Sequence, residues 1–345
     1  MAKLAEQLER KAFSAAIDVA LRRINKDREK GLLEIVDLTE KFMGDNFTKE
    51  AYEGARAMIK NPDHKWMRYV NRLLDETDPH VAKMTALNLG YQAAFYGTKT
   101  IRKMREVHDC NIPWLILMDP TSACNLHCTG CWAAEYGHKL NLTFEELDSI
   151  VTQGKELGIY FYMMTGGEPL VRKADVIKLC EKHNDVAFHC YTNGTLVDQA
   201  FCDEMKRVGN LSLSISLEGF EDTNDFRRGD GVYAKVLHAM DLLHENGLLF
   251  GNSVCYTRKN MDAVTSDEFF DLLIEHGSRF AWYFHLMPVG MDASPELMPT
   301  KEQREYIYHR IREVRGREGG KEIYVMDFQN LSLIHISEPT RRTPI

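Results

Sequence analysis

The chain has 345 residues, of which 44% are hydrophobic and 27% charged, a composition typical of a globular protein with one large domain and an appendage, or with two domains. Its formal net charge of −8 disfavours general nucleic-acid binding, which requires a basic surface. No apolar run reaches the roughly 18 residues that a membrane span needs, and the charged N-terminus is no signal peptide. We therefore expect a cytoplasmic protein without a transmembrane segment.

Residues 1–110 are predicted to be helical. Apolar residues recur every three or four positions, as at Leu4, Leu8 and Val19, which is the spacing of one helix face. We expect this region to form a helical cap packed on the main domain. The alternative is a helix that binds a membrane surface or a partner, but the mixture of acidic and basic residues on its polar faces disfavours a membrane.

From residue 111 to 330 short apolar runs alternate with amphipathic stretches. The runs predict strands at WLILMD (114–119), IYFYMMTGG (159–167), VAFHCYTNG (186–194), LSLSISLEG (211–219), LFGNSVCYT (249–257) and FAWYFHLMPVG (280–290). Between them, helices are predicted over 143–157, 173–184, 198–208, 234–247 and 266–276. Six strand–helix units in succession indicate an α/β fold with parallel strands and helical crossovers. Active sites of such folds lie at the carboxyl ends of the strands.

Residues 331–345 are predicted to be a non-native, adapter-derived tail. The segment LSLIHISEPTR has a back-translation that looks like a transposon-end sequencing adapter read as protein. We expect the natural chain to continue differently after Asn330, and we expect the tail to have no native role.

Most of the eight cysteines are expected to be inert. A chain of this length with so few cysteines does not indicate a disulfide scaffold. Cys180, Cys190, Cys202 and Cys255 lie in apolar segments, where a free thiol behaves as a small buried hydrophobe. Cys110 lies at a segment boundary and is expected to be a further inert thiol.

The remaining cysteines, Cys124, Cys128 and Cys131, lie in CNLHCTGC directly after the first predicted strand. Soft thiolates select zinc or iron–sulfur clusters. A zinc site needs a fourth ligand, for which His127 and His138 are candidates, although His127 lies between two of the cysteines. The other interpretation is a [4Fe–4S] cluster in which the chain holds three irons and the fourth binds the amine and carboxylate of a small molecule.

The CxxxCxxC motif after the first strand resembles the radical S-adenosylmethionine (radical SAM) superfamily, over roughly residues 113–330. The resemblance implies a partial (β/α)6 TIM-like barrel, here preceded by an all-helical N-terminal region. It also implies a [4Fe–4S] cluster on Cys124, Cys128 and Cys131, with S-adenosyl-L-methionine (SAM) as the second cofactor. Similar members of the superfamily often carry a C-terminal extension for auxiliary clusters.

Later strand ends add to this resemblance. The GGEP segment, made of Gly166, Gly167, Glu168 and Pro169, matches the part of the family that binds the SAM amino group, for which peptide carbonyls and a carboxylate are natural acceptors. Ser216 and Glu218 in SISLEG match a position that contacts the ribose hydroxyls or the methionine carboxylate, although many relatives have Asp where Glu218 stands.

Three further segments complete the implied cofactor site. Arg228, in preference to Arg227, would pair with the cofactor carboxylate, because a guanidinium binds a carboxylate through two parallel bonds. Thr192 and Asn193 in YTNG would face the cleft, and Pro288 in LMPVG matches the family's backbone contact to adenine.

The resemblance implies an enzyme that reductively cleaves SAM to a 5′-deoxyadenosyl radical, which takes hydrogen from an unidentified peptide, lipid or small molecule. A reducing, oxygen-free cytoplasm and an electron donor such as flavodoxin or ferredoxin are then expected. Candidate substrate contacts lie on the later strands, at His189, Tyr191, Asn252, Tyr256, Tyr283, His285 and Met287. The alternative function is a metal-stabilised binding or regulatory protein without catalysis.

Overall fold

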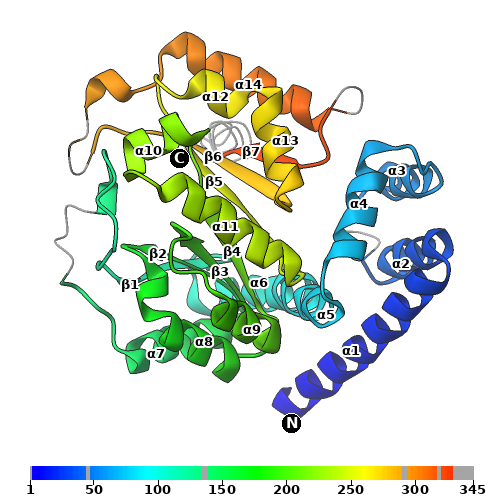
Figure 1. The fold of residues 1–345 in the computed structure, drawn as a ribbon. Helices are drawn as coiled ribbons and strands as arrows, with labels where there is room; N and C mark the ends of the chain where they lie inside the picture. The colour runs from blue at the N-terminus through cyan, green and yellow to red at the C-terminus, as the bar shows by residue number, and fades with distance from the viewer. Residues whose placement is uncertain are drawn as a thin grey trace.

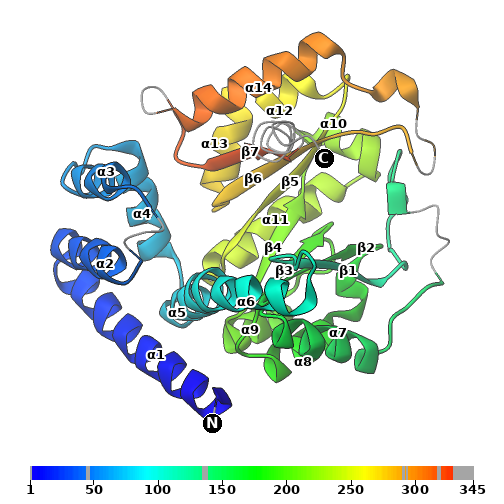
Figure 2. The ribbon, with the colours of Figure 1, turned by 180° about the vertical axis from the view of Figure 1, so that it is seen from behind.

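The computed structural model describes residues 2–43, 47–133, 139–289, 292, 294–316 and 320–328. The expectations for His138 and for the tail 331–345 therefore lie outside the described residues. Figure 1 shows the order of the elements along the chain, and Figure 2 shows the same fold from behind.

The N-terminal region is helical, as predicted. Its elements are α1 (Ala2–Lys26), α2 (Arg28–Met43), α3 (Lys49–Ile59), α4 (Lys65–Glu76), α5 (Pro79–Thr85), the π-helix η2 (Ala86–Gly97) and α6 (Thr98–His108). Figures 1 and 2 show α1–α3 set to one side, whereas α5 and α6 lie against the sheet. Val81, Ala93 and Ile101 from these inner helices join the main hydrophobic core.

The apolar stripe predicted on α1 is not the face that packs on the main domain. Leu8 and Val19 are 59% and 41% exposed. The contact of α1 with η2 is made instead by Phe13, whose ring stacks on Tyr91 at 4.2 Å, and by Arg10, which donates to the Asn88 amide oxygen at 2.7 Å. The spacing of apolar residues therefore correctly predicted a helix, but α1 contacts η2 through a different face from the one that carries this apolar stripe.

The main domain is a sheet of seven parallel strands in chain order. They are β1 (Ile116–Thr121), β2 (Phe161–Gly166), β3 (Ala187–Thr192), β4 (Leu211–Ser216), β5 (Phe250–Tyr256), β6 (Phe280–His285) and β7 (Tyr324–Asp327). The six predicted strands are confirmed, and β7 was missed because its apolar run is only four residues long. No pairing joins β1 to β7 among the described residues, so the barrel is partial.

Helices connect the strands and cover the outside of the sheet (Figure 1). They are α7 (Phe144–Glu156), α8 (Lys173–Lys182), α9 (Gln199–Val208), α10 (Glu221–Arg228), α11 (Val232–Glu245), α12 (Met261–Thr265), α13 (Asp267–Glu275) and α14 (Lys301–Arg315). Short 3-10 turns, η4 (Pro169–Arg172) and η5 (Pro295–Leu297), follow β2 and β6. Within the described chain no helix has the length and apolar content to cross a membrane.

The two faces of each strand differ in accessibility. On β6, Ala281 and Tyr283 are fully buried against the helices, and the Tyr283 hydroxyl donates to the Val264 carbonyl of α12 at 2.6 Å. Trp282 faces the inside of the barrel, where its ring lies 5.2 Å from His189 of β3. Since side chains alternate along a strand, the inner face of β6 is Phe280, Trp282 and Phe284.

The expectation that Tyr283 and His285 face the substrate together with His189 is therefore wrong. Asn252 and Tyr256 also point to the helix side, where Asn252 contacts the Met240 sulfur of α11 and Tyr256 donates to Asp327. The predicted alternation of side chains along β5 and β6 was correct, but the residues were assigned to the wrong face. Packing against α11–α14 decides which residues of these strands point away from the barrel interior.

Candidate functional site

The three clustered cysteines lie in the loop that leaves β1, at the carboxyl edge of the sheet. Cys128 is buried, and Cys124 and Cys131 are half-buried free thiols. The loop turns back on itself through the Cys131 amide, which donates to the Cys128 carbonyl at 3.1 Å. No three His, Cys, Asp or Glu side chains among the described residues are arranged to hold a single metal ion.

Several N–H groups point at these sulfurs. The Leu126 amide donates to Cys124 Sγ at 3.4 Å, and Asn193 Nδ2 lies 4.0 Å from the same atom. Arg228 Nη1 lies 3.9 Å from Cys128 Sγ. Burial raises the pKa of the Cys128 thiol, while the positive charge of Arg228 acts to lower it. Such donors stabilise negative charge on sulfur, so this donor set suits thiolate ligands.

The GGEP segment packs directly on the start of the cysteine loop. The Gly167 amide donates to the Thr121 carbonyl at 2.9 Å, and the Glu168 amide donates to the Ala123 carbonyl at 2.7 Å. Gly166 has a φ of +107°, which strains any residue with a side chain. A Cβ at Gly167 would lie 2.2 Å from the Ala123 carbonyl oxygen. Both glycines are therefore required by the close approach of the two loops.

We expect Gly167→Ala to separate these loops and to lower the free energy of unfolding by about 1–3 kcal/mol, the usual cost of overpacking. A methyl group at Gly167 would meet the backbone oxygens of Ser122 and Ala123, which cannot rotate away as a side chain would. Urea unfolding measures the effect. The matched control is Gly54→Ala in α3, where a Cβ meets nothing within 4 Å and should stabilise the helix by up to about 1 kcal/mol. Equal stability changes in the two variants would contradict this account.

Glu168 connects the segment after β2 to the end of β3, and only 1% of its surface is exposed. Its carboxylate accepts hydrogen bonds from the Leu170 amide at 2.9 Å, the Thr192 hydroxyl at 2.7 Å and the Asn193 amide at 2.7 Å. Burial raises the pKa of this carboxyl above its usual value, and the three donors oppose that rise. Pro169 begins the turn η4 that Glu168 caps.

Asn193 extends this network to the cysteine loop. Its Nδ2 donates to the Asn125 amide oxygen at 2.8 Å, and Asn125 in turn donates to the Thr195 hydroxyl at 2.8 Å. Thr192 and Asn193 are buried and bonded within the protein. This role of Asn125 was not predicted from the sequence, although its position between Cys124 and Cys128 was a signal for it.

Glu218 forms a buried ion pair with two arginines. Its side chain is fully buried, and its carboxylate accepts from Arg227 Nη1 at 2.8 Å and from Arg228 Nη2 at 2.6 Å, with a further bond from Arg228 Nε. Burial acts to raise the pKa of Glu218, but the charges of Arg228 and Arg227 outweigh it and hold that pKa below its usual value. Arg228, which was predicted in preference to Arg227 to bind a cofactor carboxylate, thus already binds a protein carboxylate, as does Arg227.

The last two predicted residues lie on the same edge of the sheet. Ser216 ends β4 and pairs with Ser253 of β5, so its hydroxyl faces the inside of the barrel. Pro288 lies exposed in the loop after β6. Gly290, at the end of that segment, lies outside the described residues. The contacts above join the segments that follow β1, β2, β3 and β4 around one mouth, and Pro288 follows β6 at the same edge of the sheet.

Comparison with known proteins identifies this arrangement. The model of the radical SAM superfamily matches residues 118–279, which run from within β1 to the residue before β6. The chain contains a radical SAM domain. Solved structures agree on the fold: the Streptococcus suis protein SuiB, bound to its precursor peptide SuiA, superposes with a TM-score of 0.54 and 17% identity over 66% of this chain and 52% of that one.

Two of the curated relatives are named as enzymes of different kinds. The AdoMet-dependent heme synthase of Methanosarcina barkeri is 28% identical over 201 residues, 56% of this chain and 57% of the relative. The GTP 3′,8-cyclase of Alkaliphilus oremlandii is 31% identical over 205 residues, 56% of this chain and 62% of the relative. The chain thus spans little more than half the length of the curated relatives it matches first.

Two residues near the mouth of the radical SAM domain were missed or misjudged. Asp119 of β1 lies beside Gly166 and accepts no hydrogen bond from any described residue, and partial burial raises its pKa. Strand alternation from Leu117 was the signal for its inward position. Cys255, expected in the core, is half-buried on the inner face of β5, where it interacts electrostatically with Arg227, Glu218 and Cys128.

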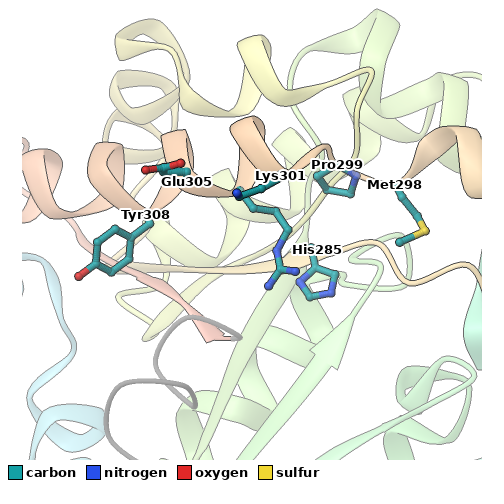
Figure 3. A pocket seen from close by; sticks show the side chains of 7 residues that line it. His285, Met298, Pro299, Lys301, Glu305 and Tyr308 are labelled. Atoms are coloured by element: carbon teal, nitrogen blue, oxygen red, sulfur yellow. The ribbon is translucent and has the colours of Figure 1, made fainter.

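His285, the last residue of β6, lies outside this mouth. It lines a separate cavity of about 380 Å³ under the start of α14, together with Met298, Lys301 and Tyr308 (Figure 3). Burial and the nearby charge of Arg304 lower the pKa of His285. His285 therefore lies on the helix side of the sheet, on the same face of β6 as Ala281 and Tyr283.

Proposed function

We propose that the chain is a radical SAM enzyme that holds a [4Fe–4S] cluster on Cys124, Cys128 and Cys131 and binds SAM at the carboxyl edge of the sheet. The observation that carries the proposal is the joining of the cysteine loop to GGEP through the two backbone bonds to Thr121 and Ala123. When bound, the cluster supplies one electron that breaks the C5′–S bond of SAM and yields methionine and a 5′-deoxyadenosyl radical.

The chain's own residues would orient the cofactors. Backbone donors and the charge of Arg228 favour thiolate at Cys124 and Cys128. The carbonyls of GGEP would accept the hydrogens of the SAM amine, because an amine bound to iron keeps its N–H donors. The Ser216 hydroxyl, which bonds to no other described residue, would contact the ribose or the carboxylate of SAM.

The arginine pair would act on the methionine carboxylate without leaving Glu218. A guanidinium has five N–H donors, and Arg228 uses only part of them on Glu218. Arg228 Nη1 lies 3.9 Å from Cys128 Sγ, on the side of the cysteine loop. We therefore propose that Glu218 fixes both guanidiniums while the remaining donors of Arg228 face the cofactor.

The reductant would be a small electron-transfer protein such as flavodoxin or ferredoxin. The substrate would be a peptide, a lipid or a small molecule whose C–H bond faces the mouth of the barrel. The relatives do not indicate which class of substrate this chain uses, because a heme synthase and a GTP cyclase catalyse different reactions.

Anaerobic reconstitution with iron and sulfide tests the proposal. We expect a brown protein that, with dithionite and SAM, forms 5′-deoxyadenosine detectable by liquid chromatography. A colourless protein with tightly bound zinc and no SAM cleavage would overturn the proposal in favour of a non-catalytic metal site.

A further inference from the structure

A carboxylate near the end of β1 lies directly against GGEP. Asp119 is exposed, whereas its neighbours Met118 and Pro120 are buried, so its side chain points to the accessible face of the strand. A Cβ built at Gly166 would lie 2.9 Å from Asp119 Cβ and 3.2 Å from the carboxyl carbon of Asp119. The missing side chain at Gly166 therefore lets the carboxyl group of Asp119 approach the backbone of GGEP.

Asp119 has no partner within the part of the chain that the structure describes. No described residue donates a hydrogen bond to its carboxylate or forms an ion pair with it. Partial burial raises the pKa of this carboxyl, and no neighbouring positive charge opposes that rise. An ionised carboxylate that has lost part of its water gains free energy from a positive group, which a ligand can supply.

The other two carboxylates of this edge of the sheet are already compensated by the protein. Glu168 accepts three hydrogen bonds from the segments after β2 and at the end of β3. Glu218 is paired with two arginines of α10. Of these three carboxylates, Asp119 is therefore the one that is free to pair with a bound molecule.

The inner face beside Asp119 offers no cation. By strand register, Thr165 of β2 and then Tyr191 of β3 follow Asp119 around the barrel. Ser216 of β4 and Ser253 of β5 pair with each other and continue this face. Hydroxyl groups such as these are uncharged at neutral pH. A positive charge next to Asp119 must therefore come from the ligand.

SAM carries such a charge close to its amine. In the proposed function, the GGEP carbonyls accept the hydrogens of that amine. Three carbon atoms join the amine of SAM to its positively charged sulfonium, which brings the sulfonium near a carboxylate that lies against GGEP. Opposite charges at short range attract strongly where water is partly excluded.

We propose that the Asp119 carboxylate pairs with the sulfonium of SAM and makes the site select the charged cofactor over uncharged thioethers of similar shape. The inference rests on the proposed function and adds to it a residue that recognises charge. Two analogues separate charge from shape. S-adenosyl-L-homocysteine keeps the amine, carboxylate and adenosine of SAM but has a neutral sulfur, whereas sinefungin carries a protonated amine in place of the sulfonium.

Calorimetric titration of the anaerobically reconstituted full chain with these three ligands, without reductant, tests the proposal. Asp119→Asn should weaken the binding of SAM and of sinefungin about tenfold, because a short-range charge pair is lost. The same variant should bind S-adenosyl-L-homocysteine like the unaltered chain. The matched control is Asp63→Asn, which neutralises an exposed carboxylate before α4 and should leave all three affinities unchanged.

Circular dichroism and thermal unfolding check that Asp119→Asn folds. If it does not, the unaltered chain still decides, because it should bind SAM and sinefungin about tenfold more tightly than S-adenosyl-L-homocysteine. Equal affinities for the three ligands, an equal loss for all three in the variant, or an unchanged SAM affinity in a folded variant would overturn this inference and leave the proposed function standing. Failure of the reconstituted chain to bind SAM at all would overturn both.

Discussion

Replacing Cys128 by alanine should abolish SAM cleavage and prevent the chain from retaining a full iron–sulfur cluster. Cys128 is the most deeply buried thiol of the loop, and Arg228 Nη1 lies 3.9 Å from its sulfur. Loss of a group that only supports a ligand typically costs about 10–100-fold in metal affinity or activity. Loss of a ligand should therefore lower 5′-deoxyadenosine formation by more than about 100-fold.

The control for this experiment is Cys110→Ala, which removes an exposed thiol outside the loop. It should leave both the iron content and the rate of SAM cleavage unchanged. Iron and acid-labile sulfide are measured on the same samples as 5′-deoxyadenosine. A Cys128→Ala protein that keeps its iron and its cleavage rate would show that the ligands have been misassigned.

Glu218→Ala should be the most destabilising single substitution near the site. It leaves Arg227 and Arg228 buried without their shared carboxylate. Removing one partner of a buried ion pair costs about 3–5 kcal/mol, because the remaining charge is uncompensated. Urea unfolding should show this loss. The matched control is Glu204→Ala, which breaks an exposed pair with Arg207 and should cost at most about 1 kcal/mol.

The same pair should make the protein sensitive to acid. The arginines hold the pKa of Glu218 below its usual value of 4.5, so the unfolded chain takes up this proton first as the pH falls. The stabilisation is complete above pH 4.5 and is lost progressively below it. Glu218→Gln lacks this contribution, so its stability deficit relative to the unaltered chain should shrink below pH 4.5. A deficit that grows with acid would contradict the depressed pKa.

The sequence predicted most of the fold because each inner strand is a short, dense apolar run followed by an amphipathic helix. It also predicted that the cysteines, GGEP and Ser216 would lie at the same edge of the sheet, since the carboxyl ends of parallel strands share one edge. The ligand and cofactor roles of these residues stay predictions, as does the division of the chain at residue 110.

What the sequence did not predict depends on contacts between distant segments. Tyr283 and Trp282 are equally favourable residues for a strand, so the sequence does not show which of them faces the barrel interior. Packing of Tyr283 against α12 decides this and leaves Trp282 inside, beside His189. The pairing of Glu218 with Arg228 requires α10 to fold back over ten residues. The missed strand β7 is positioned by its pairing with a single neighbouring strand, β6.

The contacts between the cysteine loop and α10 bear on the order of events during synthesis of the chain on the ribosome. The Thr129 amide donates to the Arg227 carbonyl at 2.9 Å, and Arg228 lies 100 residues beyond Cys128. At about 5–20 residues per second, the ribosome delivers these arginines roughly 5–20 s after the cysteines. During that interval the thiols stand without their final supports. We therefore expect insertion of the proposed cluster to follow the synthesis of α10, and the thiols to be most accessible to oxygen during that interval.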